Sequence, residues 1–148
     1  MKISTKGRYG LRAMLDLAVN ARGEHVSLNS IAARQNISEN YLEQVFSLLR
    51  KAGLVKSIKG SQGGYTLGME PSKIKVGDIL RVLEGDLLVV DEKNNEILKD
   101  NNFEYCLQLN VWNKMNESIN AVVDSMTLED LLQEYRKINT NQSYMYYI

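Results

Sequence analysis

Two short helical patterns lie next to each other near the start of the chain, joined by only a few residues. The first covers residues 31–35 and follows residues 27–30, whose serine and asparagine side chains favour a helix N-terminus. The second begins after Ser38, also a good N-cap, and continues to Gly53. Its apolar residues recur at the spacing of one buried helix face: Leu42, Val45, Phe46 and Leu49. Two capped helices joined by a short turn predict a helix-turn-helix.

The segments on either side of this pair extend the pattern. From Gly10 onward, apolar residues fall on one face of a helix that ends near residue 22: Leu11, Met14, Leu15, Ala18 and Val19. After the pair, residues 54–58 and 65–67 resemble two strands, and residues 59–64 form a glycine-rich turn. A hairpin directly after the second helix is a wing, so residues 1–70 predict a winged helix-turn-helix DNA-binding domain. Pro71 marks its boundary with a linker and helical dimerisation or sensing region, residues 71–148.

The second half of the chain contains further helical patterns. Residues 76–84 predict a short amphipathic helix ended by Gly85, and the acidic, asparagine-rich residues 86–100 predict a loop. Thr127 and Asp130 form a capping box for a final helix that is expected to end near Lys137. The apolar and aromatic tail, residues 143–148, is expected to pack or pair. The predicted fold class is therefore mainly α with a small β wing.

Between the loop and the final helix, apolar residues recur at spacings of four, four, four, three and four: Leu107, Val111, Met115, Ile119, Val122 and Met126. This pattern is close to the a/d seam of a coiled coil. It also fits a helix that lies on the core of its own domain. Because the winged domain is small, we favour a homodimer joined through a long helix, with the last five of these residues at the interface.

Charge is distributed unevenly between the two halves. The 148 residues contain 18 basic and 18 acidic side chains, but residues 1–70 carry ten basic against five acidic ones. A basic half favours a polyanionic partner, although two unequally charged faces are common in ordinary domains. No apolar run approaches the roughly 18 residues of a membrane-spanning helix, and the N-terminus lacks the apolar stretch of a signal peptide. With only one cysteine, we expect a cytoplasmic protein with no membrane partner.

The second helix of the pair carries polar side chains suited to duplex DNA. Asn40 and Gln44 present paired donors and acceptors that match adenine, while Ser38 and Tyr41 suit bases or phosphates. At its far end Arg50 is expected to hold the DNA backbone. In the predicted turn, Lys59 is accompanied by glycines that allow close approach to phosphates or the minor groove: Gly60, Gly63 and Gly64. The alternative, a solvated helix face beside a plain turn, explains fewer of these features.

Motifs that would indicate an enzyme are missing. The glycine-rich turn lacks the Gly-Lys-Ser/Thr of a phosphate-binding loop, and it precedes a strand, whereas a dinucleotide-binding motif opens a helix. His25 is the only histidine, and no serine lies in a Gly-x-Ser-x-Gly elbow. We therefore expect a protein that is not an enzyme.

Five segments together resemble the Rrf-two family of bacterial transcription regulators, and the similarity covers nearly the whole chain. They are residues 1–10 (MKISTKGRYG), 38–44 (SENYLEQ), 48–57 (LLRKAGLVKS), 63–65 (GGY) and 76–79 (VGDI). The resemblance implies a dimeric winged helix-turn-helix protein that binds a pseudo-palindromic operator. It places several residues on the DNA-contacting surface: Ser38, Asn40, Tyr41, Gln44, Arg50 and Lys59. Glu43 matches a residue linked to operator choice in the branch that binds an iron–sulfur cluster.

The predicted sensing region departs from that branch. Its members carry three closely spaced cysteines before the dimerisation helix, where this chain has only Cys106. One thiolate is a poor cage for an iron–sulfur cluster, even with help from carboxylates such as Asp100 or Glu104, so no cofactor is expected. We favour a buried, structural Cys106 over a redox-sensing thiol, because acidic neighbours disfavour the thiolate.

The chain resembles most the branch of cysteine-metabolism repressors, in which the signal arrives through a partner, cysteine synthase. The leading hypothesis is therefore a repressor of cysteine or sulfur genes. The alternatives are an iron–sulfur, redox or metal-sensing regulator of cluster-assembly genes and an interaction module for an enzyme.

Overall fold

The computed structural model describes residues 1–61, 63–90 and 101–146, with the backbone alone for residues 143–146. Its elements follow in chain order: α1 (Thr5–Asn20), α2 (Leu28–Gln35), α3 (Glu39–Lys51), β1 (Val55–Ile58), β2 (Gly64–Leu67), η1 (Pro71–Lys73), α4 (Val76–Glu84), α6 (Asn102–Leu107), η2 (Gln108–Trp112), α7 (Asn113–Asp124) and α8 (Leu128–Tyr146). The predicted fold class, mainly α with a small β wing, is confirmed.

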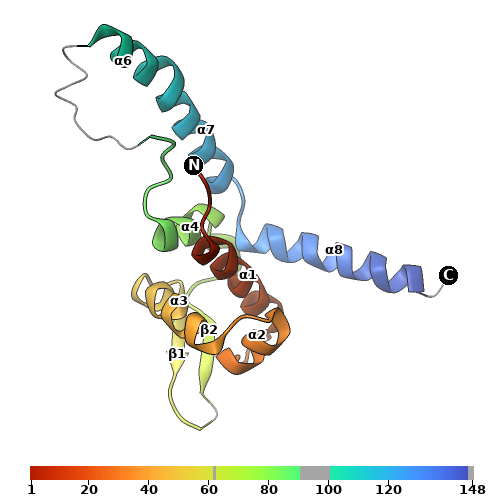
Figure 1. Ribbon diagram of the computed structural model, residues 1–148. Coiled ribbons are helices and arrows are strands. Elements are labelled where there is room, and N and C mark those ends of the chain that lie inside the picture. The colour runs from red at the N-terminus through yellow and green to blue at the C-terminus, as the bar shows by residue number, and fades with distance from the viewer. Residues whose placement is uncertain (62, 91–100, 147–148) are drawn as a thin grey trace.

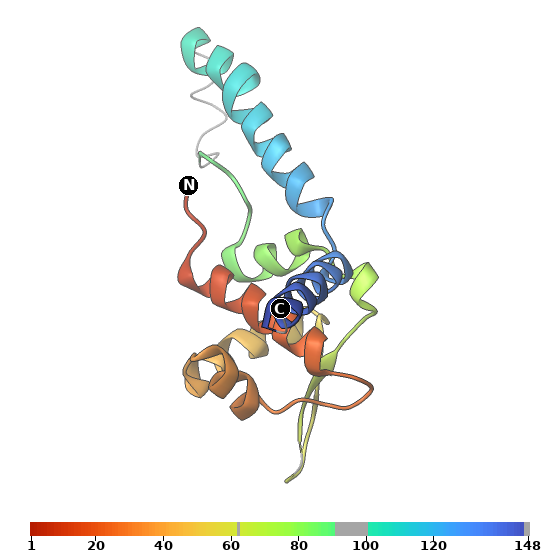
Figure 2. The same ribbon diagram turned by 90° about the vertical axis from the view of Figure 1, so that its right-hand side faces the viewer.

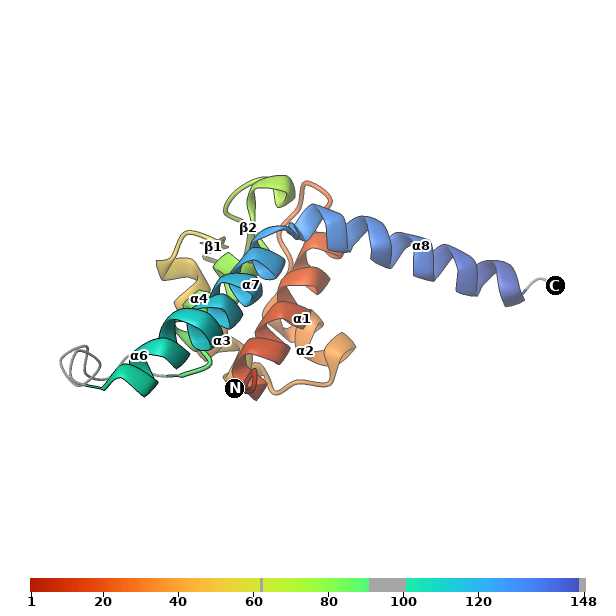
Figure 3. The ribbon, with the colours of Figure 1, turned by 90° about the horizontal axis from the view of Figure 1, so that it is seen from above.

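The elements form a body with two projections. In Figure 1, α1 to α4 and the hairpin pack together, while α6 and α7 rise from this body as one rod. The hairpin extends below the helices, at the opposite end from α6 (Figure 2). Figure 3 shows α8 running away from the body in a third direction. None of the described helices is long and apolar enough to span a lipid bilayer.

α3 forms as its sequence predicts. Ser38 is its N-cap, because its Oγ accepts a hydrogen bond from the Tyr41 backbone N–H at 3.0 Å. The buried side chains are the four predicted ones: Leu42, Val45, Phe46 and Leu49. α2 begins at Leu28, earlier than expected, because the Ser27 hydroxyl caps it by accepting from the Ser30 N–H.

α1 begins earlier than its apolar pattern indicates, and it buries a different face. Its buried apolar side chains are Ala13, Met14, Leu17 and Ala18, whereas Leu11 and Leu15 are only half-buried. The difference arises because the glycines on this face, Gly7 and Gly10, allow α4 to pack closely. A Cβ on Gly10 would overlap the Leu83 side chain of α4.

An ion pair between a buried carboxylate and a partly exposed arginine joins α1 to α2. Asp16 is 5% exposed, yet its carboxylate accepts hydrogen bonds from the Arg34 guanidinium, with the shortest at 2.8 Å. Gln35 Nε2 donates to the same carboxylate at 2.7 Å, and Asn20 Nδ2 at 3.2 Å. These bonds satisfy a charge that would otherwise be costly to bury. They also hold the end of α2, the first helix of the helix-turn-helix, against α1.

The main core includes residues from both sides of Pro71. Ile74, Ile79, Leu83 and Leu128 are buried in the same cluster as the apolar faces of α1 and α3. α4 ends at Gly85, as predicted. The division of the chain at residue 70 stays a prediction, and most of the predicted loop, residues 91–100, lies outside the described residues.

The structure differs from the predicted coiled-coil seam at one end of the pattern. Met126 follows the C-cap of α7, Ser125, so it is not on the rod, and it packs with Ile119 against a small core that contains Val76, Leu80 and Leu87. Both side chains are half-buried in their own chain, and their place in the dimer interface stays a prediction. Three other apolar side chains of the pattern are left exposed on the rod: Leu107, Met115 and Val122.

Two further expectations were wrong. α8 continues to Tyr146, well past Lys137, although its Thr127–Asp130 capping box forms as predicted, with each backbone N–H donating to the other side chain at 2.9 and 3.1 Å. Cys106 is exposed. The reason is that the described residues 101–107 lie at the outer end of the rod, where none of them is covered by the body.

The rod is fastened to α4 by a polar cluster. Arg81 donates through Nη1 to Asp124 Oδ1 at 2.9 Å and through Nη2 to Asp124 Oδ2 at 2.7 Å. Its Nε and Nη2 also donate to Asn120 Oδ1. Two asparagines of α7 also bind the backbone that follows α4. Asn120 Nδ2 donates to the Leu87 carbonyl, and Asn116 Oδ1 accepts from the Val89 N–H. The rod therefore has a defined attachment to the helix that packs on α1.

This cluster predicts a pH dependence of stability. Hydrogen bonding to the Arg81 guanidinium lowers the pKa of Asp124 below its ordinary value, so the pair stabilises the fold above that value, and the contribution is lost as pH falls through the lowered pKa. Both side chains are about a third exposed, which limits the contribution to about 0.5–1 kcal/mol. Denaturant unfolding of Asp124→Asn should show this loss at pH 7 and converge with the wild type once the pH falls below the lowered pKa of Asp124. A difference that persists unchanged at low pH would contradict the assignment.

Candidate nucleic-acid interface

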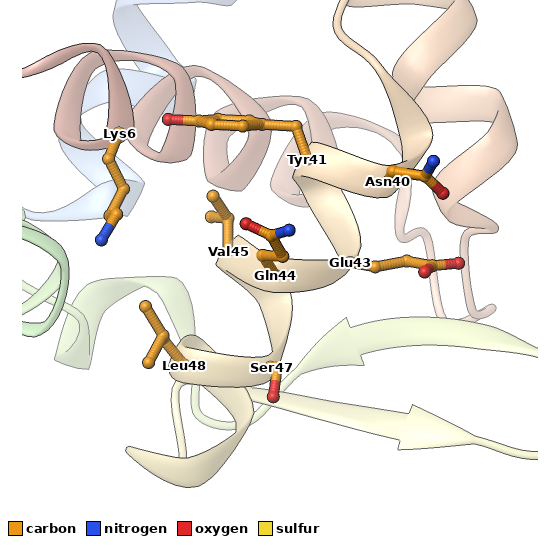
Figure 4. A pocket seen from close by; sticks show the side chains of 8 residues that line it. All are labelled: Lys6, Asn40, Tyr41, Glu43, Gln44, Val45, Ser47 and Leu48. Atoms are coloured by element: carbon orange, nitrogen blue, oxygen red, sulfur yellow. The ribbon is translucent and has the colours of Figure 1, made fainter.

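The outward face of α3 carries an uninterrupted set of polar side chains. Asn40, Glu43 and Gln44 are exposed, and Ser47 follows one turn further along. Figure 4 shows these side chains around an open hollow of about 670 Å³, with Lys6 of α1 at its edge. Asn40 and Gln44 are four residues apart, so one helix face offers two amide groups able to donate and accept at once. This is the chemistry that pairs with an adenine edge.

The position of α3 relative to α1 is fixed by aromatic contacts. The Tyr41 and Tyr9 rings meet edge to face with their centroids 6.1 Å apart. The Arg12 guanidinium lies 4.7 Å from the centroid of the Tyr9 ring. Tyr41 is half-buried because part of its ring packs against Tyr9, while its hydroxyl points along the hollow (Figure 4). Ser38, as N-cap, likewise uses its oxygen within the fold.

The hairpin presents Lys59 beside glycines that its own geometry requires. Lys59 is exposed at the end of β1, and Gly60 has a φ of 126°, which disfavours other residues. The Gly63 N–H donates to the Gly60 carbonyl at 3.0 Å, and a Cβ on Gly63 would overlap the Ile58 carbonyl. Gly64 lies against the Val26 carbonyl. These glycines therefore shape the turn, and their approach to DNA stays a prediction.

The basic side chains of residues 1–70 differ in the contacts that they make within the fold. Arg34 is committed to Asp16, and the hydrogen bonds to that carboxylate raise the pKa of its guanidinium. Arg50 and Lys51 are exposed in the last turn of α3, where the prediction places backbone contacts. Lys6 lines the hollow too, a position that its sequence pattern did not predict. Its signal was its place in the segment of residues 1–10 that carried the family resemblance.

Cys106 is the one cysteine that the sequence offers to the predicted sensing region. Among the described residues, no group of three or more histidine, cysteine, aspartate or glutamate side chains could hold a metal ion. Asn110 Nδ2 donates to the Cys106 carbonyl at 2.8 Å and lies 3.7 Å from its Sγ. An iron–sulfur cluster needs several thiolates, so the donor set on this part of the chain does not fit one.

A helix-turn-helix with an exposed amide face on its second helix, followed directly by a β-hairpin, defines the winged helix-turn-helix class of DNA-binding regulators. A family model described as an iron-dependent transcriptional regulator, Rrf2, matches residues 3–134. The chain therefore belongs to the Rrf2 family, as the sequence resemblance predicted.

Individual relatives agree with this assignment. The chain is 49% identical over all 148 residues to the HTH-type transcriptional regulator CymR of Bacillus subtilis, and the match covers 100% of both chains. A solved structure of CymR, described as the global cysteine regulator of B. subtilis, superposes with a TM-score of 0.76 at 47% identity, over 90% of this chain and 98% of that one. The structure of T. potens IscR gives a TM-score of 0.74 at 49% identity, over 99% and 96% of the two chains.

Gln44 provides a direct test of the interface. Replacing Gln44 with alanine removes an exposed amide without touching the core, so the fold should be unaffected. We expect relaxed base preference at one position of each half-site, worth roughly 1–3 kcal/mol. Selection from a randomised duplex library measures this, with Gln133→Ala on α8 as a matched loss of an exposed glutamine. An unchanged preference in Gln44→Ala would place α3 elsewhere than in the major groove.

Proposed function

We propose that this chain is a sequence-specific repressor that binds a pseudo-palindromic operator as a homodimer. The observation that carries the proposal is the exposed amide face of α3, capped by Ser38 and flanked by the hairpin, in a member of the Rrf2 family. α3 enters the major groove and the hairpin reaches the adjacent minor groove. The residues predicted to contact DNA belong to α3, its N-cap and the hairpin: Ser38, Asn40, Tyr41, Glu43, Gln44, Arg50, Lys59, Gly60, Gly63 and Gly64.

We further propose that its target genes serve cysteine or sulfur metabolism. Support comes from the end-to-end similarity to CymR of B. subtilis and from the description of that protein as a global cysteine regulator. Cysteine synthase is the proposed co-regulator, as the resemblance to this branch implies. The operator is expected beside genes for cysteine uptake or synthesis.

The proposed dimer forms along the rod. Met115 and Val122 are 44% and 57% exposed, and Phe103 at the outer end is 86% exposed. Val111, Met115 and Ile119 line a shallow depression of about 420 Å³ on the same face. An apolar face of this length on a projecting rod is unusual for a monomer and fits a second copy of the rod.

A second candidate is a regulator of cluster-assembly genes. The similarity to T. potens IscR over nearly the whole chain favours it. The donor set around Cys106 speaks against a cluster of the cysteine-ligated kind. The two candidates differ in the genes that the operator adjoins and in the visible absorption of the purified protein.

The test is selection of genomic fragments by protein purified without oxygen, followed by sequencing and an absorption spectrum. We expect a palindromic motif beside cysteine or sulfur genes and no cluster absorption. A motif beside cluster-assembly genes, with absorption from about one cluster per subunit, would establish the second candidate. Failure to recover any motif, with or without added cysteine synthase, would overturn the proposed function.

The dimer proposal predicts the effect of one charge on the rod. Val122→Glu should shift the protein toward monomers and lower operator affinity at least tenfold, because a buried unpaired carboxylate opposes association. Val122 is exposed in the single chain, so the monomer should fold. Sedimentation velocity measures the shift, and Glu117→Gln, on the other side of α7, serves as the control. A Val122→Glu protein that remains dimeric would exclude this face.

A further inference from the structure

Lys6 lies on the stripe of α1 that faces α3. Residues 6, 10 and 13 are one helical turn apart, so their side chains share one face. A Cβ on Gly10 would overlap the Leu83 side chain of α4 and would lie 3.3 Å from Val45 Cγ1 of α3, so this face of α1 meets both helices. Ala13, one turn further, is fully buried. Lys6 therefore occupies the exposed end of the α1–α3 contact, beside the middle of the proposed recognition helix.

Among the described residues, no carboxylate pairs with the Lys6 ammonium group. The Lys6 side chain is exposed. The other cations of α1 have contacts: Arg8 Nη2 donates to Thr5 Oγ1 at 3.3 Å, and Arg12 lies over Tyr9. Lys6 thus combines an exposed charge with a position at the hollow that Asn40, Glu43 and Gln44 line.

Lys6 and the hairpin lie on opposite sides of α3. Figure 4 shows Lys6 on the side of Val45 and Leu48, while the two strands pass on the side of Ser47 and Glu43. A helix in the major groove is bordered by two phosphate backbones, one on each side of a groove about 12 Å wide. The hairpin, with Lys59, is placed to contact the backbone between the major groove and the adjacent minor groove. The second backbone runs on the side of Lys6.

We infer that Lys6 binds a phosphate of this second backbone, so that α3 is held between Lys6 on one side and the wing on the other. This inference rests on the proposed function, because it requires α3 to enter the major groove. An ammonium group recognises a phosphate as a point charge and carries no base preference. Lys6 therefore sets the register and depth of α3 in the groove, while the amides on α3 select the bases.

The test compares Lys6→Gln with Lys137→Gln, which removes the same charge from α8, far along the chain from α3. Each lost phosphate contact should lower the slope of log affinity against log salt by about 0.9. The dimer loses two such contacts, so its slope should fall by about 1.8, and the loss of affinity between 50 and 200 mM salt should shrink about 12-fold. Lys6→Gln should select the same motif as the wild type. Lys6→Arg should restore the slope, and Lys137→Gln should keep it.

Phosphate ethylation interference on the selected operator locates the contact. In the wild type, one ethylated phosphate per half-site, on the strand across the major groove from the Lys59 contact, should block binding. In Lys6→Gln that phosphate should no longer interfere, whereas Lys59→Ala should release a different phosphate. A folded Lys6→Gln protein with an unchanged salt slope and footprint would overturn the inference while leaving the proposed function intact. A wild-type protein without any operator would instead overturn the proposed function.

Discussion

The close packing of α1 against α4 is the constraint on which the other elements depend. Gly7 and Gly10 leave no room for side chains, since a Cβ on either would overlap Glu84 or Leu83 of α4. Glu84 in turn accepts hydrogen bonds from the Ser4 and Gly7 backbone N–H groups, which places a carboxylate at the positive end of α1. With its start fixed in this way, α1 presents its next turns to α3 and so determines where the polar face of α3 points.

The same contact connects the rod to the proposed DNA surface. Arg81 on α4 holds Asp124 and Asn120 of α7 through both sides of its guanidinium, a geometry that resists rotation better than a single hydrogen bond does. α4 packs on α1, and α1 packs on α3. In the proposed dimer, this series of rigid contacts sets the separation of the two recognition helices.

Features that one short segment defines were predicted correctly, whereas features that depend on the packing of distant segments were not. α3 was predicted correctly because Ser38 and four apolar residues at helical spacing define it within a single segment. Met126 was assigned to the rod wrongly, since its spacing fits a helix but the chain turns at Ser125 to begin α8. The exposure of Cys106 depends on how far the rod projects, which no local pattern records. Lys6 was missed because its role appears only when α1 and α3 are packed together.

The distribution of charge explains how a chain with no net charge can bind a polyanion selectively. The second half of the chain carries eight basic against thirteen acidic residues, and its rod and α8 project away from the hairpin and α3 (Figure 1). This arrangement favours approach of DNA to one end of the molecule and disfavours the other. Arg34 is paired with Asp16, which leaves nine other basic side chains in residues 1–70. Contacts to phosphates carry no sequence information, so in the proposed complex the discrimination between sites falls to the amides of Asn40 and Gln44.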